Sequence, residues 1–121
     1  MRLLIYSDVN GFGGHEVMTI HALRYLASNT DWNIKFVGYE GNVRFLERVR
    51  QIPNILVETT PHGTRSLQGL RSWLQGVAVR QTMSLLSKAE PDLVVFSQGG
   101  VEQGSVGLIA GHKLKLNTVS Y

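Results

Sequence analysis

The fold is decided by residues 2–26, which read RLLIYSDVNGFGGHEVMTIHALRYL. The apolar run LLIY predicts a buried strand over Leu3–Ser7, and the segment Asp8–Gly14 that follows is rich in glycine. Apolar side chains then recur at helical spacing, which predicts an amphipathic helix over Glu16–Ser28. A strand that leads through a glycine turn into a helix points backbone N–H groups and the positive end of a helix dipole at one spot. The stretch therefore predicts a site for an anion, above all a phosphate.

The rest of the chain alternates short apolar segments with helical patterns. The expected strands are Leu3–Ser7, Ile34–Tyr39, Ile55–Thr59, Leu93–Ser97 and Thr118–Tyr121. The expected helices are Glu16–Ser28, Asn42–Gln51, Ser66–Ala89 and Val101–Leu114. Strands and helices in alternation favour parallel strands joined by right-handed crossovers. The predicted fold class is therefore α/β, a Rossmann-like three-layer sandwich around a parallel sheet of about five strands in the order 3-2-1-4-5.

Each helical pattern also predicts a face that packs on the sheet. The expected core residues of the first three helices are Val17, Ile20, Leu23 and Ala27, then Val43, Leu46 and Val49, then Leu67, Leu70, Leu74, Val77 and Leu85. We expect the third helix to be interrupted near Gly76. The fourth helix is rich in glycine and alanine and is expected to pack closely on the sheet.

The predicted strand order brings two loops to one crevice. In this order the chain reverses direction across the sheet between the first and fourth strands, and ligands bind at such a switch point. The loops after those strands are Asp8–Gly14 and Gln98–Gly104, and both are rich in glycine. At the start of the second loop, Ser97 and Gln98 either hydrogen-bond a sugar hydroxyl or cap the next helix. Two glycine clusters at one predicted crevice favour a ligand site there.

The first glycine turn has three interpretations. Gly11 and Gly13 match half of a dinucleotide-binding fingerprint, but Glu16 stands at the third glycine position, where a carboxylate would repel a pyrophosphate. Glu40, which follows the second strand, keeps an NAD site open because it is placed to hold a ribose hydroxyl. Alternatively, the glycines only permit a tight turn with positive φ. We favour the third interpretation, a site for a nucleotide-sugar or another anion.

Four segments occur in an informative order: NGFGGHE at 10–16, EPDLVVF at 90–96, GLIA at 107–110 and LNTVSY at 116–121. In their order and spacing they resemble the N-terminal domain of retaining GT-B glycosyltransferases of the group 1, family 4-like type. That domain has a Gly-Gly-x-Glu turn after its first strand and a Pro-Asp-apolar run at its fourth. It then has a small-residue helix before a strand that ends in tyrosine. The resemblance covers nearly the whole chain.

The resemblance implies that residues 1–121 are the acceptor-side, Rossmann-like domain of a longer two-domain enzyme. Such an enzyme moves a sugar from a nucleotide-sugar donor to a carbohydrate or lipid-linked acceptor. Its donor site is completed by a C-terminal domain, so the fragment alone is expected to be inactive. By the same resemblance, Gly13 and Gly14 would approach the donor diphosphate. The nucleotide-diphosphate sugar is a substrate, and the resemblance implies neither a further cofactor nor a metal.

The candidate acceptor-binding residues are His15, Glu16, His62, Ser97, Gln98 and Gly99. His15 lies in the glycine turn and contacts either a phosphate, an acceptor or only solvent. His62 follows the third strand and opens onto the same side as the crevice. Where the family often has a histidine after its fourth strand, this chain has Ser97, Gln98 and Gly99. The sequence therefore names no catalytic residue, and the resemblance implies that the leaving phosphate accepts the proton.

Composition and charge limit the kinds of site and partner that we expect. The 121 residues suit one domain, and the lack of cysteine excludes disulfides and thiolate metal sites. The formal charge of +3 is mild, and we expect no nucleic-acid partner. The segment between Glu58 and Glu90 holds no acidic residue but several basic ones. It is either a solvated helix face or a surface for an anionic lipid or substrate. We expect a cytoplasmic protein, with weak attachment to the inner face of the membrane as the alternative.

Two other functions stay open at this level. One is a stand-alone nucleotide- or phosphate-binding module with a Rossmann-like fold. The other, less favoured, is an NAD-binding domain. All three functions use the first glycine turn, and they differ in whether the ligand site is complete within these 121 residues.

Overall fold

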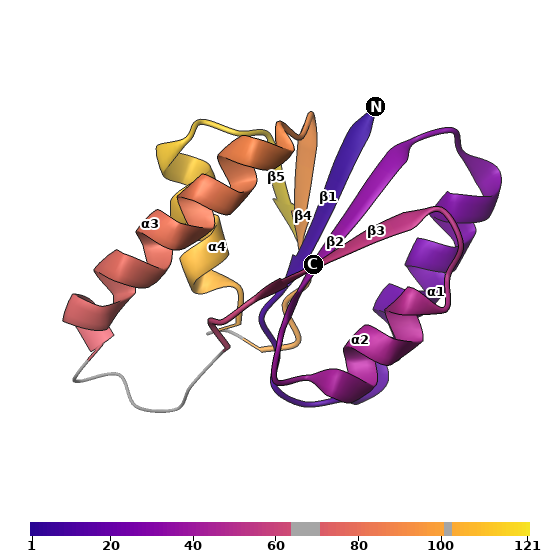
Figure 1. Cartoon of the computed structure of the whole chain (residues 1–121), viewed down its shortest axis with the longest axis horizontal. Coiled ribbons are helices and arrows are strands. Elements are labelled where there is room, and N and C mark those ends of the chain that lie inside the picture. Colours follow the sequence, from indigo (N-terminus) through magenta and orange to yellow (C-terminus); the bar gives the residue numbers. More distant parts are fainter. Residues whose placement is uncertain (64–70, 101–102) are drawn as a thin grey trace.

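The computed structural model describes residues 1–63, 71–100 and 103–121, and of residues 71–75 only the backbone. Within these ranges strands and helices alternate along the chain (Figure 1). The strands are β1 (Arg2–Ser7), β2 (Asn33–Tyr39), β3 (Ile55–Thr60), β4 (Leu93–Phe96) and β5 (Thr118–Ser120). The helices are α1 (Gly14–Asn29), α2 (Val43–Arg50), α3 (Arg71–Ala89) and α4 (Ser105–Lys113). Every expected element is present; the expected helical residues 66–70 and 101–102 lie outside the described ranges.

The strands form a parallel sheet in the order β3-β2-β1-β4-β5, which confirms the predicted topology. β1 lies at the centre, where Ile5 pairs with Phe36 of β2 and with Val95 of β4. Helices α1 and α2 cover one face of the sheet, and α3 and α4 cover the other (Figure 1). Residues Leu3–Ser7 are therefore all buried, as the continuous apolar run predicts. No helix in the described ranges is long and apolar enough to span a bilayer.

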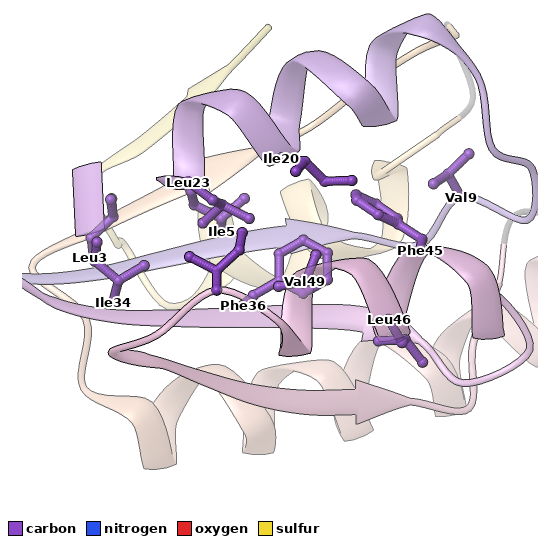
Figure 2. Close-up of a cluster of buried hydrophobic side chains, with 11 residues drawn as sticks. Leu3, Ile5, Val9, Ile20, Leu23, Ile34, Phe36, Phe45, Leu46 and Val49 are labelled. Carbon is purple, nitrogen blue, oxygen red and sulfur yellow. The ribbon is translucent and has the colours of Figure 1, made fainter. Parts of the chain in front are cut away.

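An apolar cluster fills each side of the sheet. The cluster below α1 and α2 includes Leu23, Phe36 and Phe45 (Figure 2). The rings of Phe36 and Phe45 meet edge-on with centroids 5.1 Å apart. The cluster below α3 and α4 includes Tyr6 and Phe96, whose rings also meet edge-on at 5.6 Å. Tyr6 and Phe96 lie near the carboxyl ends of β1 and β4, so this packing supports the sheet where the two glycine loops leave it.

Several expected details of the helices are wrong. Helix α3 continues through Gly76 without interruption. The exposed side chains among the expected core residues are Val17, Val43 and Val77. On the same helices the side chains of Thr19, Phe45 and Val79 are buried instead. The angle at which a helix lies on the sheet selects its buried face, and a short apolar pattern does not determine that angle. The positions of Leu67 and Leu70, and the side chain of Leu74, lie outside the described residues.

Candidate functional site

The loops after β1 and β4 meet at the carboxyl edge of the sheet. Nε2 of His15, in the first turn of α1, lies 2.8 Å from Oγ of Ser97, the residue after β4. A Cβ added to Gly99 would stand 3.5 Å from the His15 side chain, so this second loop runs directly beside the histidine. The two loops therefore meet where the strand order predicts, and His15 is half-buried between them rather than a solvent-facing side chain.

A chain of hydrogen bonds continues behind His15. Oγ of Ser97 lies 3.0 Å from Oγ1 of Thr19, and that atom lies 2.8 Å from the hydroxyl of Tyr121. Thr19 Oγ1 also donates to the backbone carbonyl of His15 at 3.0 Å. The Tyr121 ring packs near the imidazole of His15, with centroids 5.1 Å apart. Residues from α1, from the end of β4 and from beyond β5 thus hold one another at the crevice.

The first glycine turn leaves its backbone uncovered. Gly11, Gly13 and Gly14 are exposed, and among the described glycines Gly104 alone has a positive φ. The interpretation that the turn needs glycine for positive φ is therefore wrong. A Cβ at Gly11 or Gly14 would meet nothing within 4 Å. Gly13 is the N-cap of α1 and offers the helix no side-chain cap. Neither strain nor packing within the chain requires glycine at position 14.

Glu16 lies under the turn rather than in the crevice. Its side chain is only 6% exposed, and Oε2 accepts a hydrogen bond from the backbone N–H of Gly13 at 2.7 Å. This is half of a capping box, in which a carboxylate in the first turn satisfies an N–H group that the helix leaves unpaired. The carboxylate also opposes the positive end of the α1 dipole. An anion that binds at this helix start would therefore be held more weakly than at an uncompensated one.

Asn42 ties the glycine turn to α2. Its side-chain amide donates to the backbone carbonyls of Val9 at 2.9 Å and of Gly11 at 2.7 Å. Its Oδ1 accepts from the backbone N–H of Phe45 at 3.4 Å, which caps α2. Asn42 is 4% exposed, so water cannot easily replace these bonds. One buried amide therefore sets the position of the turn relative to the second helix.

We predict that Asn42→Asp lowers the free energy of unfolding by about 2 kcal/mol. The carboxylate keeps the α2 cap, but it replaces an NH₂ donor with an oxygen that faces the carbonyls of Val9 and Gly11. Urea unfolding of the variant and the wild type measures the loss. Asn42→Ala is the companion variant because it removes the cap as well. Wild-type stability in Asn42→Asp would contradict the role of the amide.

The second glycine loop is tied back to β1. Gly104, in the left-handed conformation with φ of 74°, is the N-cap of α4, and its N–H donates to Oδ1 of Asp8 at 2.8 Å. Gln98 Nε2 donates to the backbone carbonyl of Gln103 at 2.6 Å, which closes the loop on itself. The interpretation that Ser97 and Gln98 cap the next helix is therefore wrong. Gly104 takes the cap position, while Ser97 is buried beside His15 and Gln98 is half-buried in the loop.

Tyr6 lies below the crevice on the α3 side. Its side chain is fully buried. Burial raises the pKa of its hydroxyl well above the ordinary value, and the nearby Asp8 carboxylate raises it further. The phenol therefore stays neutral at every physiological pH. Its ring packs on Phe96 and supports this edge of the sheet.

The remaining histidines lie apart from His15. His62 follows β3, and its Nε2 hydrogen-bonds to Oε1 of Gln81 on α3. His21 and His112 are exposed on α1 and α4. In the described ranges, no three His, Cys, Asp or Glu side chains gather in a way that could hold a metal ion. Of the basic residues in the acid-free segment, Arg65 and the side chain of Arg71 lie outside the described part of the chain.

A cavity of about 510 Å³ lies at the opposite edge of the sheet, where the strands begin. Its lining includes Arg2 of β1, Asn33 of β2 and Ile55 of β3. It shares no residue with the two glycine loops. Ligands of open α/β sheets bind at the carboxyl edge, so we take the two loops there as the candidate site.

The sequence patterns identify the residues of the two loops but not the side chains that hold those loops in place. The glycine turn, His15, Ser97 and Gln98 follow from the motifs and the strand order. The side chains that hold them, Asp8, Thr19, Asn42 and Tyr121, do not stand out. Asn42 alone carries a local signal, because asparagine is a preferred helix N-cap. The others act across 78 to 102 residues of chain, as in the Thr19 contacts with Ser97 and Tyr121.

Comparison with solved structures supports the fold. MurG of Acinetobacter baumannii aligns with a TM-score of 0.69 and 14% identity, over 98% of this chain and 34% of MurG. A deacetylase solved with teicoplanin aligns at 0.67 and 12%, over 98% of this chain and 68% of its own. The glycosyltransferase VinC, solved with dTDP, aligns at 0.59 and 10%, over 99% and 34%. No protein-family model and no curated protein matches the sequence.

These likenesses bear on the architecture. The chain spans about a third of the length of MurG and of VinC, so it corresponds to one domain of each. At 10–14% identity the alignments show a shared arrangement of strands and helices, and they do not show shared chemistry. The Rossmann-like fold expected from the resemblance to GT-B glycosyltransferases is confirmed: the chain has the fold found in one domain of such enzymes.

Proposed function

We propose that this chain is the acceptor-side domain of a GT-B glycosyltransferase. In the complete enzyme it moves a sugar from a nucleotide-sugar donor to a carbohydrate or lipid-linked acceptor. A second domain supplies most of the donor site across the crevice. Two things support the proposal: the fold shared with glycosyltransferases, and the two glycine loops that meet at the switch point of the sheet.

The observation that carries the proposal is the exposed backbone of Gly13 and Gly14, of which the N–H of Gly13 already donates to Glu16. Both are exposed, both lie at the start of the 16-residue helix α1, and neither has positive φ. Among the described residues nothing lies within 4 Å of a Cβ at Gly14, so the missing side chain leaves room for a partner from outside the chain. A diphosphate that approaches the helix start is such a partner, since it needs close contact with N–H groups.

In the proposed enzyme, Glu16 weakens the binding of a diphosphate at the start of α1. Its buried carboxylate already opposes the helix dipole, which amounts to about half an elementary charge at the N-terminus. The net attraction for a diphosphate at this wall is therefore small. In the proposed enzyme the glycine turn provides close approach, while the second domain provides most of the binding free energy.

The acceptor is proposed to lie along the other wall. His15 is half-buried, Gln98 is half-buried and Gly99 is exposed, so these three residues line the space between the loops. Ser97 is 1% exposed and bonded to His15, which suits it to hold the histidine rather than to touch a sugar. His62, bonded to Gln81 on α3, would contact only a long acceptor.

Calorimetry with UDP and dTDP on the 121-residue chain tests whether this chain holds only part of the donor site. We expect dissociation constants weaker than about 1 mM, because one wall of a shared site makes few contacts. A micromolar site within this chain would instead support a stand-alone nucleotide- or phosphate-binding module. Titration with NADH is the parallel measurement for the NAD alternative, and we expect no binding.

A further inference from the structure

The hydroxyl chain behind His15 has one donor–acceptor assignment that satisfies every contact. Thr19 Oγ1 has a single hydrogen, and a backbone carbonyl can only accept, so that hydrogen goes to the carbonyl of His15. Thr19 Oγ1 must then accept from both of its other neighbours, the hydroxyls of Ser97 and Tyr121. Ser97 has thereby used its own hydrogen. It must accept from Nε2 of His15 at 2.8 Å.

Burial favours the assignment, because it keeps all four contacts as hydrogen bonds. Thr19 is 0% exposed and Ser97 is 1% exposed, so water does not offer either hydroxyl a different partner. The competing arrangement, in which Thr19 donates to Ser97 and Ser97 donates to Nε2, gives up the hydrogen bond from Thr19 Oγ1 to the His15 carbonyl. The Tyr121 ring, with its centroid 5.1 Å from that of the imidazole, limits rotation of His15 on one side.

We infer that Thr19, acting through Ser97, is a positioning residue that holds neutral His15 in the Nε2–H form, so that Nδ1 accepts a hydrogen bond from a hydroxyl of the acceptor. No described residue hydrogen-bonds Nδ1 in the structure. An unprotonated ring nitrogen attracts hydroxyl donors and repels phosphate oxygens. The inference rests on the proposed function and deepens it, because it assigns His15 to the acceptor hydroxyl rather than to the donor phosphate.

The experiment reads the tautomer directly. Long-range proton–nitrogen correlation spectra of the isotopically labelled 121-residue chain, recorded at about pH 8 where an ordinary histidine is neutral, distinguish Nε2–H from Nδ1–H. His15→Gln assigns the signals among the four histidines. We expect wild-type His15 to be almost entirely in the Nε2–H form. An Nδ1–H form in the wild type would overturn the inference without any variant.

Two variants test whether Thr19 is the cause. In Thr19→Val the Ser97 hydrogen loses its acceptor and turns to Nε2 of His15, so we expect Nδ1–H to become the major form. Thr19→Ser keeps the oxygen and its bond to the preceding turn, so we expect the wild-type spectrum. An unchanged tautomer in Thr19→Val would also overturn the inference. If Thr19→Val does not fold, Ser97→Ala replaces it, with a mixture of both forms expected.

A separate titration keeps this inference distinct from the proposed function. The tautomer is measured on the free chain and needs no substrate. Addition of a simple glycoside at high concentration then reports on the acceptor: we expect the Nδ1 resonance to move while Nε2 stays protonated. A locked tautomer with no response of Nδ1 to the glycoside would count against the acceptor role, and an unlocked tautomer would count against the role of Thr19.

Discussion

In the proposed two-domain enzyme, Gly14→Val is expected to lower the rate of glycosyl transfer by about 100-fold, because the side chain would keep the diphosphate away from the N–H groups at the start of α1. The loss of one donor to a developing charge has an effect of this size. The side chain would stand at the start of α1, in the space where we place the donor diphosphate. Because no described residue lies within 4 Å of a Cβ at this position, the variant is expected to fold normally. Steady-state kinetics with the natural donor and acceptor measures the loss.

Gly11→Val is the matched control for this prediction. Gly11 lies in the same turn, is exposed, has no positive φ and would also place its Cβ in open space. It precedes the helix start by three positions and does not present an N–H group of the first turn. We expect near-normal turnover and, for both variants, unfolding free energies within about 0.5 kcal/mol of wild type. Equal activity of the two variants would refute the phosphate role of Gly14.

Gly107→Val is expected to lower the free energy of unfolding by about 3 kcal/mol, the upper end of the range for overpacked cores. A Cβ at this position in α4 would stand 2.5 Å from the ring of Phe96 and 2.9 Å from the ring of Tyr6. Both rings are fully buried and cannot move aside cheaply. Urea unfolding followed by circular dichroism gives the loss.

Gly76→Val in α3 is the control. Gly76 also lies within a helix, but it is exposed and its Cβ would meet nothing within 4 Å. Valine and glycine differ in helix propensity by only a few tenths of a kcal/mol, so we expect a change below about 0.5 kcal/mol. A similar loss in both variants would mean that Gly107 is needed for something other than close packing of α4 on the sheet.

The two glycines show how far sequence patterns reach. Both lie in predicted helices, and the pattern gives a reason to expect a break only at Gly76, where α3 in fact continues. The central place of β1 was predictable because a parallel strand buried on both faces is apolar along its whole length. The buried faces of α1 and α2 were harder to predict. Val17 and Val43 are exposed, since the packing angle of a helix is a property of the assembled layers.

The sequence by itself determined the alternation of strands and helices, the strand order and the two glycine loops that meet at the switch point. Those features depend on local periodicity and on the handedness of crossovers, which act over short stretches of chain. Only the tertiary structure decided how His15 is held. Its partner Ser97 lies 82 residues away and Tyr121 reaches Thr19 across 102 residues, and single hydroxyl contacts at such separations leave no periodic trace. Their directions are set by burial, because a hydroxyl shielded from water must use the partner that folding brings to it.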